Sequence, residues 1–168
     1  MPRIAIGLVR LIDRLNYGVG RMAMYLLFVL MGILMWSTIS KAAFTPSLWT
    51  LEMAQFVMVA YFVLGGPYAM QMGSHVRMDL FYAQQSPVRR AWWDAITVLA
   101  LIFYLGVMLW GAVDSTLYSL QYNERSPTAW RPYLWPIKVI LCIGFLLMLL
   151  QALAALIRDI ATIRGETI

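Results

Sequence analysis

The chain has 168 residues, with 62% hydrophobic and 12% charged side chains, a formal net charge of +5 and a mean hydropathy of +0.72. Soluble domains have about 25% charged residues, so this composition excludes an ordinary soluble domain and indicates an integral membrane protein. Because apolar residues are spread along the whole chain, we expect a single membrane domain over residues 1–168. The positive charge is attributed to topology and to contact with membrane lipids, and no nucleic-acid partner is expected.

Residues 1–20 are predicted to form an amphipathic helix that lies in the membrane interface. With an advance of about 100° per residue, one side of this helix is apolar and a narrow opposing stripe is basic. The basic stripe consists of Arg3, Arg10, Arg14 and Arg21. This pattern is typical of a helix parallel to a membrane surface. The alternative is a basic lead that merely precedes the first span.

Four uncharged runs follow, at residues 22–40, 53–74, 95–113 and 139–157. Each is close to the roughly 20 helical residues that cross a bilayer core of about 30 Å, and none alternates like a barrel strand. We therefore expect an all-α integral membrane protein with four transmembrane helices. Hydroxyl and proline start signals refine the bounds, so the expected spans are about 22–40, 46–72, 87–122 and 136–158. A cleaved signal peptide is an alternative for the first run, against which its long polar lead argues.

The second predicted helix contains Gly65, Gly66 and Pro67 in succession. Proline removes one backbone hydrogen bond and clashes with the preceding turn, so we expect the helix to kink or break here. Broken helices form ion sites in some transporters, but no acidic residue and no second broken helix accompanies this segment. A packing kink is the favoured interpretation.

The basic residues predict the orientation of the chain. If the amino terminus is cytoplasmic, the inner side holds Arg3, Arg10, Arg14, Arg21, Arg77, Arg89, Arg90, Arg158 and Arg164, and the outer side holds Lys41, Arg125, Arg131 and Lys138. The excess on the inner side favours both termini in the cytoplasm.

Each predicted helix has one charged residue near its outer end. Antiparallel neighbours bring Lys41 toward Glu52, and Asp114 toward Lys138. We predict two outer-face ion pairs, each worth no more than about 1 kcal/mol at a partly solvated boundary. The alternative is four charges that extend independently to the headgroups.

The segment GSHVRMDLF, residues 73–81, contains the only histidine of the chain. Gly73, His75, Arg77 and Asp79 are predicted to form a structural or interface motif where the second helix leaves the inner face. Asp79 is expected to cap a short helix, and Arg77 to reach headgroups or a carboxylate. No nucleophile motif accompanies the histidine, so a catalytic centre is not expected. One histidine and one cysteine also exclude bis-histidine haem ligation and disulfide exchange, and no cofactor or metal site is predicted.

None of the four uncharged runs contains a charged side chain. A charge inside a span is costly and usually functional, so ion-coupled transport by this chain alone is not expected. Polar residues within the runs, such as Gln55, Gln71 and Gln151, are interpreted as hydrogen-bonding contacts between helices. These features favour an accessory or scaffold subunit of a larger membrane complex. A stand-alone small four-helix carrier is the alternative.

The motif GSHVRMDLF resembles the Gly-x-His-x-x-x-Asp signature that follows the second helix in small permease subunits of tripartite ATP-independent periplasmic (TRAP) transporters. The matching positions are Gly73, His75 and Asp79. The resemblance extends over LEMAQFVMVAYFVLGGPYAMQMGSHVRMDLFY, FYLGVMLWGAVDSTLYSL and SPTAWRPYLWPIK. These segments are similar to the branch described as mannitol or chloroaromatic type, whereas the first helix is less distinctive.

The resemblance implies a complex in the bacterial inner membrane. In that complex a periplasmic binding protein delivers the substrate, usually an organic acid, to a large and a small permease subunit. A sodium gradient drives uptake by symport, without ATP. The large subunit carries the substrate and sodium sites on a moving elevator domain, and the small subunit enlarges the static scaffold. By this resemblance the chain is a scaffold subunit and not an enzyme.

Overall fold

The computed structural model describes residues 3–73 and 87–163, and these residues are almost entirely helical. The helices are α1 (Arg3–Ala43), α2 (Thr50–Gln71), α4 (Pro87–Tyr122) and α5 (Trp135–Ile163). All four of these helices are long and apolar enough to cross a membrane. The prediction of an all-helical chain with four long apolar helices is therefore confirmed.

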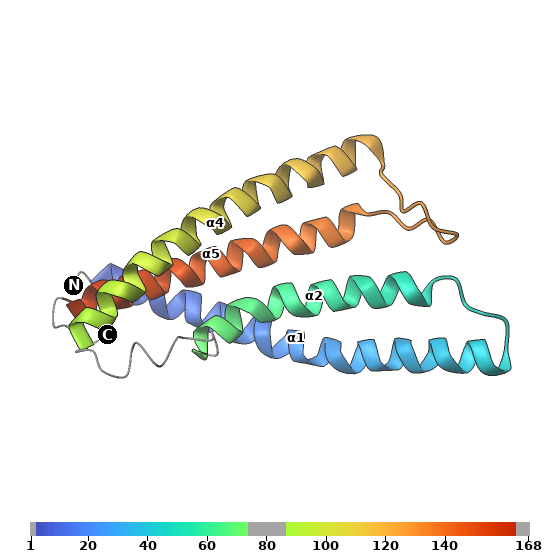
Figure 1. Ribbon diagram of the computed structural model, residues 1–168, viewed down its shortest axis with the longest axis horizontal. Coiled ribbons are helices and arrows are strands. Elements are labelled where there is room, and N and C mark those ends of the chain that lie inside the picture. Colours follow the sequence, from blue (N-terminus) through green and yellow to red (C-terminus); the bar gives the residue numbers. More distant parts are fainter. Residues whose placement is uncertain (1–2, 74–86, 164–168) are drawn as a thin grey trace.

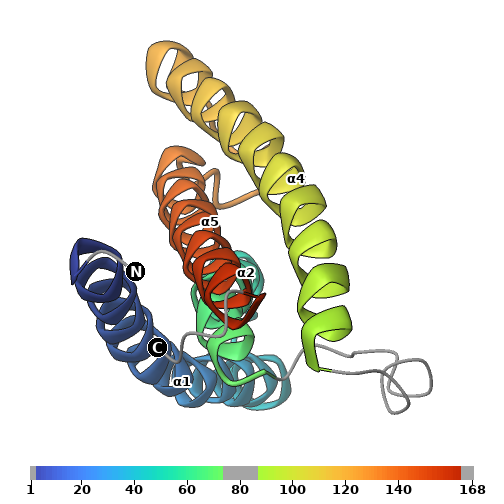
Figure 2. The ribbon, with the colours of Figure 1, turned by 90° about the vertical axis from the view of Figure 1, so that its left-hand side faces the viewer.

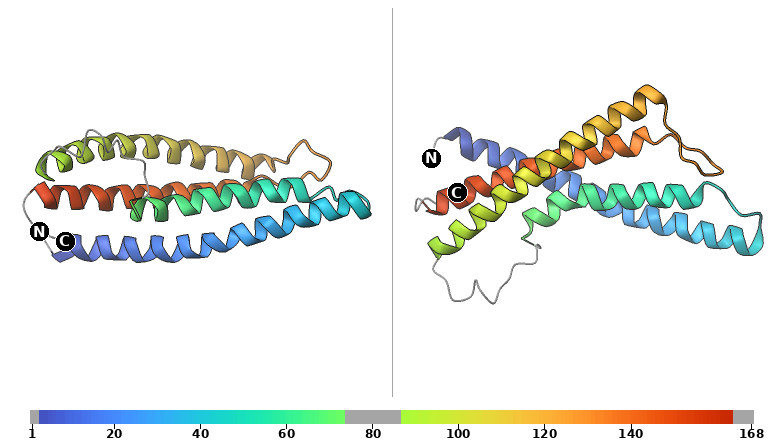
Figure 3. Two further views of the ribbon diagram at one scale, coloured as in Figure 1. Left: turned by 60° about the horizontal axis from the view of Figure 1, so that its bottom comes forward. Right: turned by 45° about the horizontal axis from the view of Figure 1, so that its top comes forward.

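The helices form two antiparallel hairpins, α1 with α2 and α4 with α5 (Figure 1). The hairpins pack together through α5, which contacts α1, α2 and α4. Seen along the bundle, α5 lies between α1 on one side and α4 on the other (Figure 2). The start of α1 and the end of α5 lie together at one end, which we call the terminal end (Figure 1). The α1–α2 and α4–α5 connections lie at the opposite, connection end (Figure 3).

α1 is one continuous helix of 41 residues, about 60 Å long at ~1.5 Å per residue. This differs from the expectation of one helix over residues 1–20 followed by a separate span over 22–40. Buried positions recur on one face along the whole of α1: Val9, Ile12, Asn16, Gly20, Ala23, Ser37 and Ser40. Because that face packs on other helices from end to end, tertiary contacts keep the basic segment in line with the span.

α2 begins at Thr50, later than the predicted start near Pro46. The intervening residues belong to the connection from α1, which is held by hydroxyl groups. Ser47 Oγ lies 3.1 Å from Ser40 Oγ and donates to Thr50 Oγ1 at 3.2 Å. Thr50 Oγ1 also lies 3.2 Å from Ser37 Oγ, and both of these residues are buried. α2 therefore begins at Thr50, the residue whose side chain is hydrogen-bonded to α1.

α2 continues without interruption through Gly65, Gly66 and Pro67. The segment therefore does not break the helix, and Figure 3 shows the C-terminal part of α2 turning away from the line of its first part. The absence of a side chain at Gly66 admits α5, because a Cβ there would lie 3.1 Å from Met148 Sδ. Gly66 therefore allows α5 to pack closely against α2.

α4 has 36 residues, about 54 Å at ~1.5 Å per residue, and occupies the predicted range 87–122. α5 extends beyond the predicted range 136–158. α4 packs mainly along α5, so much of its surface faces away from the bundle. Large exposed apolar side chains recur there at intervals of three, four or seven residues, as on one face of a helix: Trp92, Ile96, Leu99, Phe103, Val107, Trp110 and Leu117. Such a face suits lipid or a partner subunit.

Candidate functional site

Polar side chains from α1, α2 and α5 meet toward the terminal end of the bundle. Asn16 Nδ2 donates to Gln151 Oε1 at 2.5 Å, and Gln151 Nε2 donates to Asp13 Oδ1 at 3.2 Å. Arg158 forms an ion pair with Asp13, and Gln71 Nε2 donates to the Asp13 backbone oxygen at 3.3 Å. These five residues, Asp13, Asn16, Gln71, Gln151 and Arg158, are called the polar network below.

The polar network is buried at its centre and more exposed at its edge. Asn16 and Gln151 are each 1% exposed, whereas the Arg158 and Asp13 side chains are 36% and 24% exposed. Hydrogen bonds between buried polar side chains hold membrane helices in one register. A shift of the helices would leave these polar groups without partners in an apolar medium, which is unfavourable. The network therefore fastens α1 and α2 to α5.

Two acceptor atoms of the polar network have no donor within the described part of the chain, Asn16 Oδ1 and Gln71 Oε1. Of the three glutamines predicted to contact other helices, Gln71 and Gln151 make such hydrogen bonds, whereas Gln55 is exposed. The sequence pattern did not predict the contacts of Asp13 and Asn16. The signal that could have found them is their position next to Val9 and Ile12, on the face of α1 that the apolar residues mark as buried.

The GSHVRMDLF motif begins at the end of α2, close in sequence to Gln71. Gly73 has a φ of +66°, and its backbone N–H donates to the Met70 oxygen at 3.2 Å. A left-handed residue directly after a helix is a common helix end, and glycine adopts it without a steric penalty. Gly73 thus ends α2. His75, Arg77 and Asp79 lie outside the described residues, so their predicted roles stay predictions.

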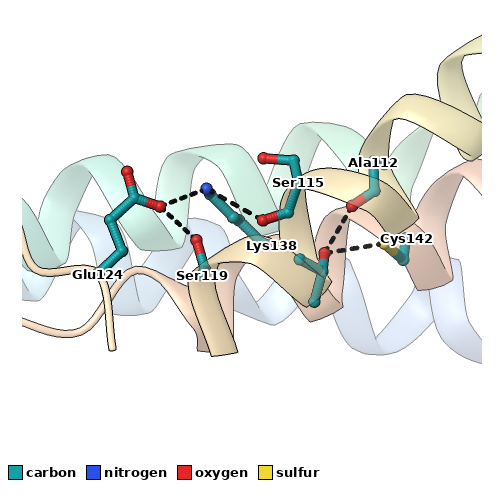
Figure 4. Close-up of polar contacts among 7 residues, drawn as sticks. Ala112, Ser115, Ser119, Glu124, Lys138 and Cys142 are labelled. Atoms are coloured by element: carbon teal, nitrogen blue, oxygen red, sulfur yellow. Dashed lines mark hydrogen bonds and ion pairs between the residues drawn. The ribbon is translucent and has the colours of Figure 1, made fainter. Parts of the chain in front are cut away.

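A second polar cluster closes the α4–α5 hairpin at the connection end (Figure 4). Lys138 Nζ lies 2.7 Å from Glu124 Oε2 and 3.4 Å from the Ser115 backbone oxygen. Ser119, which is fully buried, donates its hydroxyl to the same Glu124 oxygen. We call Ser119, Glu124 and Lys138 the hairpin clasp. The hydrogen bonds from Lys138 and then from Ser119 lower the pKa of the Glu124 carboxyl below its ordinary value of 4.5.

The connection between α4 and α5 positions Glu124 for this contact. Arg125 pairs with Tyr133 across an isolated antiparallel bridge, and its guanidinium carbon lies 4.3 Å from the Tyr133 ring centre. Leu134 N–H donates to the Glu124 backbone oxygen at 3.2 Å. The connection therefore folds back over the start of α5 and brings Glu124 to Lys138.

The outer-face pairs expected from the sequence are not the ones that form. Lys138 is paired with Glu124 and not with Asp114, whose side chain is exposed. Lys138 approaches the backbone oxygen of Ser115, the residue after Asp114, but its ion pair within the described residues is with Glu124. Lys41 is exposed, whereas Glu52 is only 5% exposed and its Oε2 has no hydrogen-bond partner in the described residues.

The polar contacts that the structure describes join helices to one another. Among residues 3–73 and 87–163, no group of three or more His, Cys, Asp or Glu could hold a metal ion. Cys142 is partly buried, and its Sγ lies 3.3 Å from Thr116 Oγ1, which donates to the Ala112 oxygen. The polar network joins helices that are distant in the sequence, and the hairpin clasp joins two consecutive helices through their connection.

Comparison with known proteins places the chain in a family. The family described as "Tripartite ATP-independent periplasmic transporters, DctQ component" matches residues 30–162, which is most of the chain. The chain belongs to this family. This DctQ-family chain is also 32% identical, over 117 residues, to the isethionate TRAP transporter permease protein DctMQ of Oleidesulfovibrio alaskensis. The match covers 67% of this chain but only 18% of that relative. No solved structure matches the chain.

Membership of the DctQ family gives the four long helices their context. As a member of this TRAP transporter component family with four long apolar helices, the chain is a multi-pass membrane protein. The family is a transporter component, which points away from an enzyme. The resemblance drawn from GSHVRMDLF is thus confirmed at the level of the family.

Proposed function

We propose that this DctQ-family chain is a scaffold subunit of a sodium-driven TRAP transporter in the bacterial inner membrane. In this role it enlarges and stabilises the static part of the large permease subunit. It binds neither the substrate nor sodium. Both of its termini face the cytoplasm, which is the arrangement favoured by the distribution of arginine and lysine.

The observation that carries the proposal is the way the chain uses its polar groups. All four apolar runs lack charged residues, and it is charged residues inside a span that usually mark ion pathways and proton relays. The buried amides of Asn16 and Gln151 bond to each other, and the buried hydroxyl of Thr50 bonds to α1. These groups are engaged in holding helices together, as a static scaffold requires.

The transported solute is proposed only by class. The TRAP resemblance implies a periplasmic binding protein that delivers an organic acid or a related small solute. The mannitol or chloroaromatic likeness of the sequence and the isethionate transporter among the relatives point to different substrates. Substrate choice is therefore assigned to the binding protein and the large subunit.

Reconstitution into liposomes tests the proposal. The chain alone, the large subunit alone and the pair are compared, each with the cognate binding protein and with an inward sodium or potassium gradient. The solute is one that raises the melting temperature of the binding protein. Uptake is expected only for the pair, and only with the sodium gradient and the binding protein.

Three results would contradict the proposal in whole or in part. Uptake by the chain alone would make it a stand-alone carrier. Full activity and full thermal stability of the large subunit alone would remove the need for a scaffold. A pair that transports without a sodium gradient would contradict the sodium coupling alone.

A further inference from the structure

An apolar groove runs between α1 and the last three turns of α2. Its volume is about 410 Å³, within the range of about 300–1,000 Å³ that is usual for small-molecule pockets. It is open on one side. Its lining consists of Gly20, Ala23, Met24, Tyr61, Phe62, Gly65, Gly66, Tyr68, Ala69 and Met72.

The groove exists because small residues line part of it between larger ones. At Gly65 no atom lies within 4 Å of the position that a Cβ would take. Phe62 and Met72 are 61% and 54% exposed and border the open side. The side chains that line an unfilled apolar space lack dispersion contacts on the side that faces it. In a bilayer, an acyl chain or a side chain of another protein is the material that can fill it.

Arginines flank the same seam. Arg14 and Arg21 are exposed and lie three residues before and four residues after Tyr17, so the three share one flank of α1. The Tyr17 ring contacts the ring of Tyr68, which lines the groove, at 5.8 Å between centroids. Arg10 lies one turn further along that flank and is also exposed. None of these three arginines has an ion-pair partner within residues 3–73 and 87–163.

The charge and the depth of these arginines favour a lipid as the occupant. Arg21 stands at the end of the uncharged run that contains Met24, so its guanidinium can extend to the headgroup layer while the groove lies among acyl chains. Arginine near a membrane surface attracts anionic lipids. A partner protein would have to supply an apolar side chain and a carboxylate at the right separation, whereas one anionic phospholipid carries both an acyl chain and a phosphate.

We propose that the α1–α2 groove binds one acyl chain of an anionic phospholipid whose phosphate contacts the arginine flank at Arg14 and Arg21. The lipid fills the groove and neutralises the flank. This inference goes beyond the proposed function and does not depend on sodium coupling or on the substrate.

Photo-crosslinking tests the site on the unaltered protein. The full chain, alone and paired with its large subunit, is placed in phosphatidylcholine nanodiscs that contain a minor fraction of phosphatidylglycerol with a photoactivatable acyl chain. Adducts are located by mass spectrometry of peptides. They are expected to concentrate on residues 20–24 and 61–72 in both samples. Labelling that is spread evenly over the apolar face of α4 would overturn the proposal. Loss of groove labelling in the pair would also overturn it, because the large subunit would then occupy the groove.

Variants separate the acyl-chain contact from the headgroup contact. Gly65→Leu puts a side chain into open groove space and is expected to abolish retention of phosphatidylglycerol in native mass spectrometry. Gly32→Leu is the matched control, because a Cβ at Gly32 also meets no atom but Gly32 is outside the groove. Arg21→Gln should lower the preference for phosphatidylglycerol over phosphatidylcholine about fivefold, which corresponds to about 1 kcal/mol for one arginine near an anionic surface.

Helical circular dichroism of each variant verifies folding before lipid is measured. Retention of phosphatidylglycerol by folded Gly65→Leu at the level of Gly32→Leu would contradict the groove as the site. An unchanged lipid preference in Arg21→Gln would contradict the headgroup contact. If Gly65→Leu fails to fold, the crosslinking pattern of the unaltered protein decides the question.

Discussion

Gly144 of α5 lies in direct contact with Val63 of α2. A Cβ placed on Gly144 would lie 2.0 Å from Val63 Cγ1 and 3.0 Å from the Val63 backbone oxygen. Small residues let membrane helices approach one another this closely, which increases the dispersion contacts on which their association in lipid depends. This contact joins the two hairpins of the bundle.

The first prediction is that Gly144→Ala destabilises the folded chain. The methyl group would overlap Val63, and overpacking typically costs about 1–3 kcal/mol. The thermal unfolding midpoint of the purified chain in detergent should fall. Gly32→Ala should not lower it, because that position is open. Addition of Val63→Ala should restore part of the loss, and no restoration would show that the backbone contact dominates.

The second prediction concerns the buried amide pair of the polar network. Gln151→Leu removes the side-chain partner of Asp13 Oδ1 and leaves Asn16 Nδ2 with only the Leu147 backbone oxygen at 3.5 Å. A buried polar group that loses its partner costs about 1–3 kcal/mol. The double change Asn16→Leu with Gln151→Leu should cost less than the sum of the single changes, because it removes both groups. Gln55→Leu, at an exposed position, is the control. Additive effects in denaturant unfolding would mean that the two amides act independently.

The third prediction is a loss of stability in acid at the hairpin clasp. Lys138 and Ser119 hold the pKa of Glu124 below 4.5. A lowered folded-state pKa stabilises the protein above the ordinary value, and this contribution is lost as the pH falls through the folded-state pKa. Melting temperatures recorded from about pH 6 to pH 3 should fall less in Glu124→Gln than in the unaltered chain. Asp114→Asn, which removes an exposed carboxyl of α4 outside the hairpin clasp, is the matched control for the change in charge.

The fourth prediction concerns orientation. In a Cys142→Ser background, Thr128→Cys places a thiol in the α4–α5 connection and Thr162→Cys places one near the end of α5, and both positions are exposed. With the termini in the cytoplasm, a membrane-impermeant maleimide added to spheroplasts should label the first and spare the second until the membrane is opened. The reverse pattern would place the termini outside.

Much of the fold could be predicted from the sequence because the bilayer imposes a simple rule. A helix that crosses it needs about 20 apolar residues, so uncharged runs revealed four long helices. Local start signals placed the third predicted helix at 87–122, where α4 spans Pro87–Tyr122. The same local reasoning placed the start of the second helix too early. There, hydroxyl contacts of Thr50 with α1 decide where α2 begins, and no local pattern contains them.

The sequence by itself determined that this protein lies in a membrane, that it is helical and to which family it belongs, because hydropathy and a short motif are local properties. The tertiary structure decided which polar residues meet. Asp13 contacts Arg158 across 145 positions of the chain, and Lys138 selects Glu124 over Asp114 because the connection folds back over α5. Such pairings depend on the rotation of each helix about its axis and on the path of its connections. Both are fixed only when the helices pack, since a helix in lipid gains nothing from any one rotation until a neighbour supplies contacts.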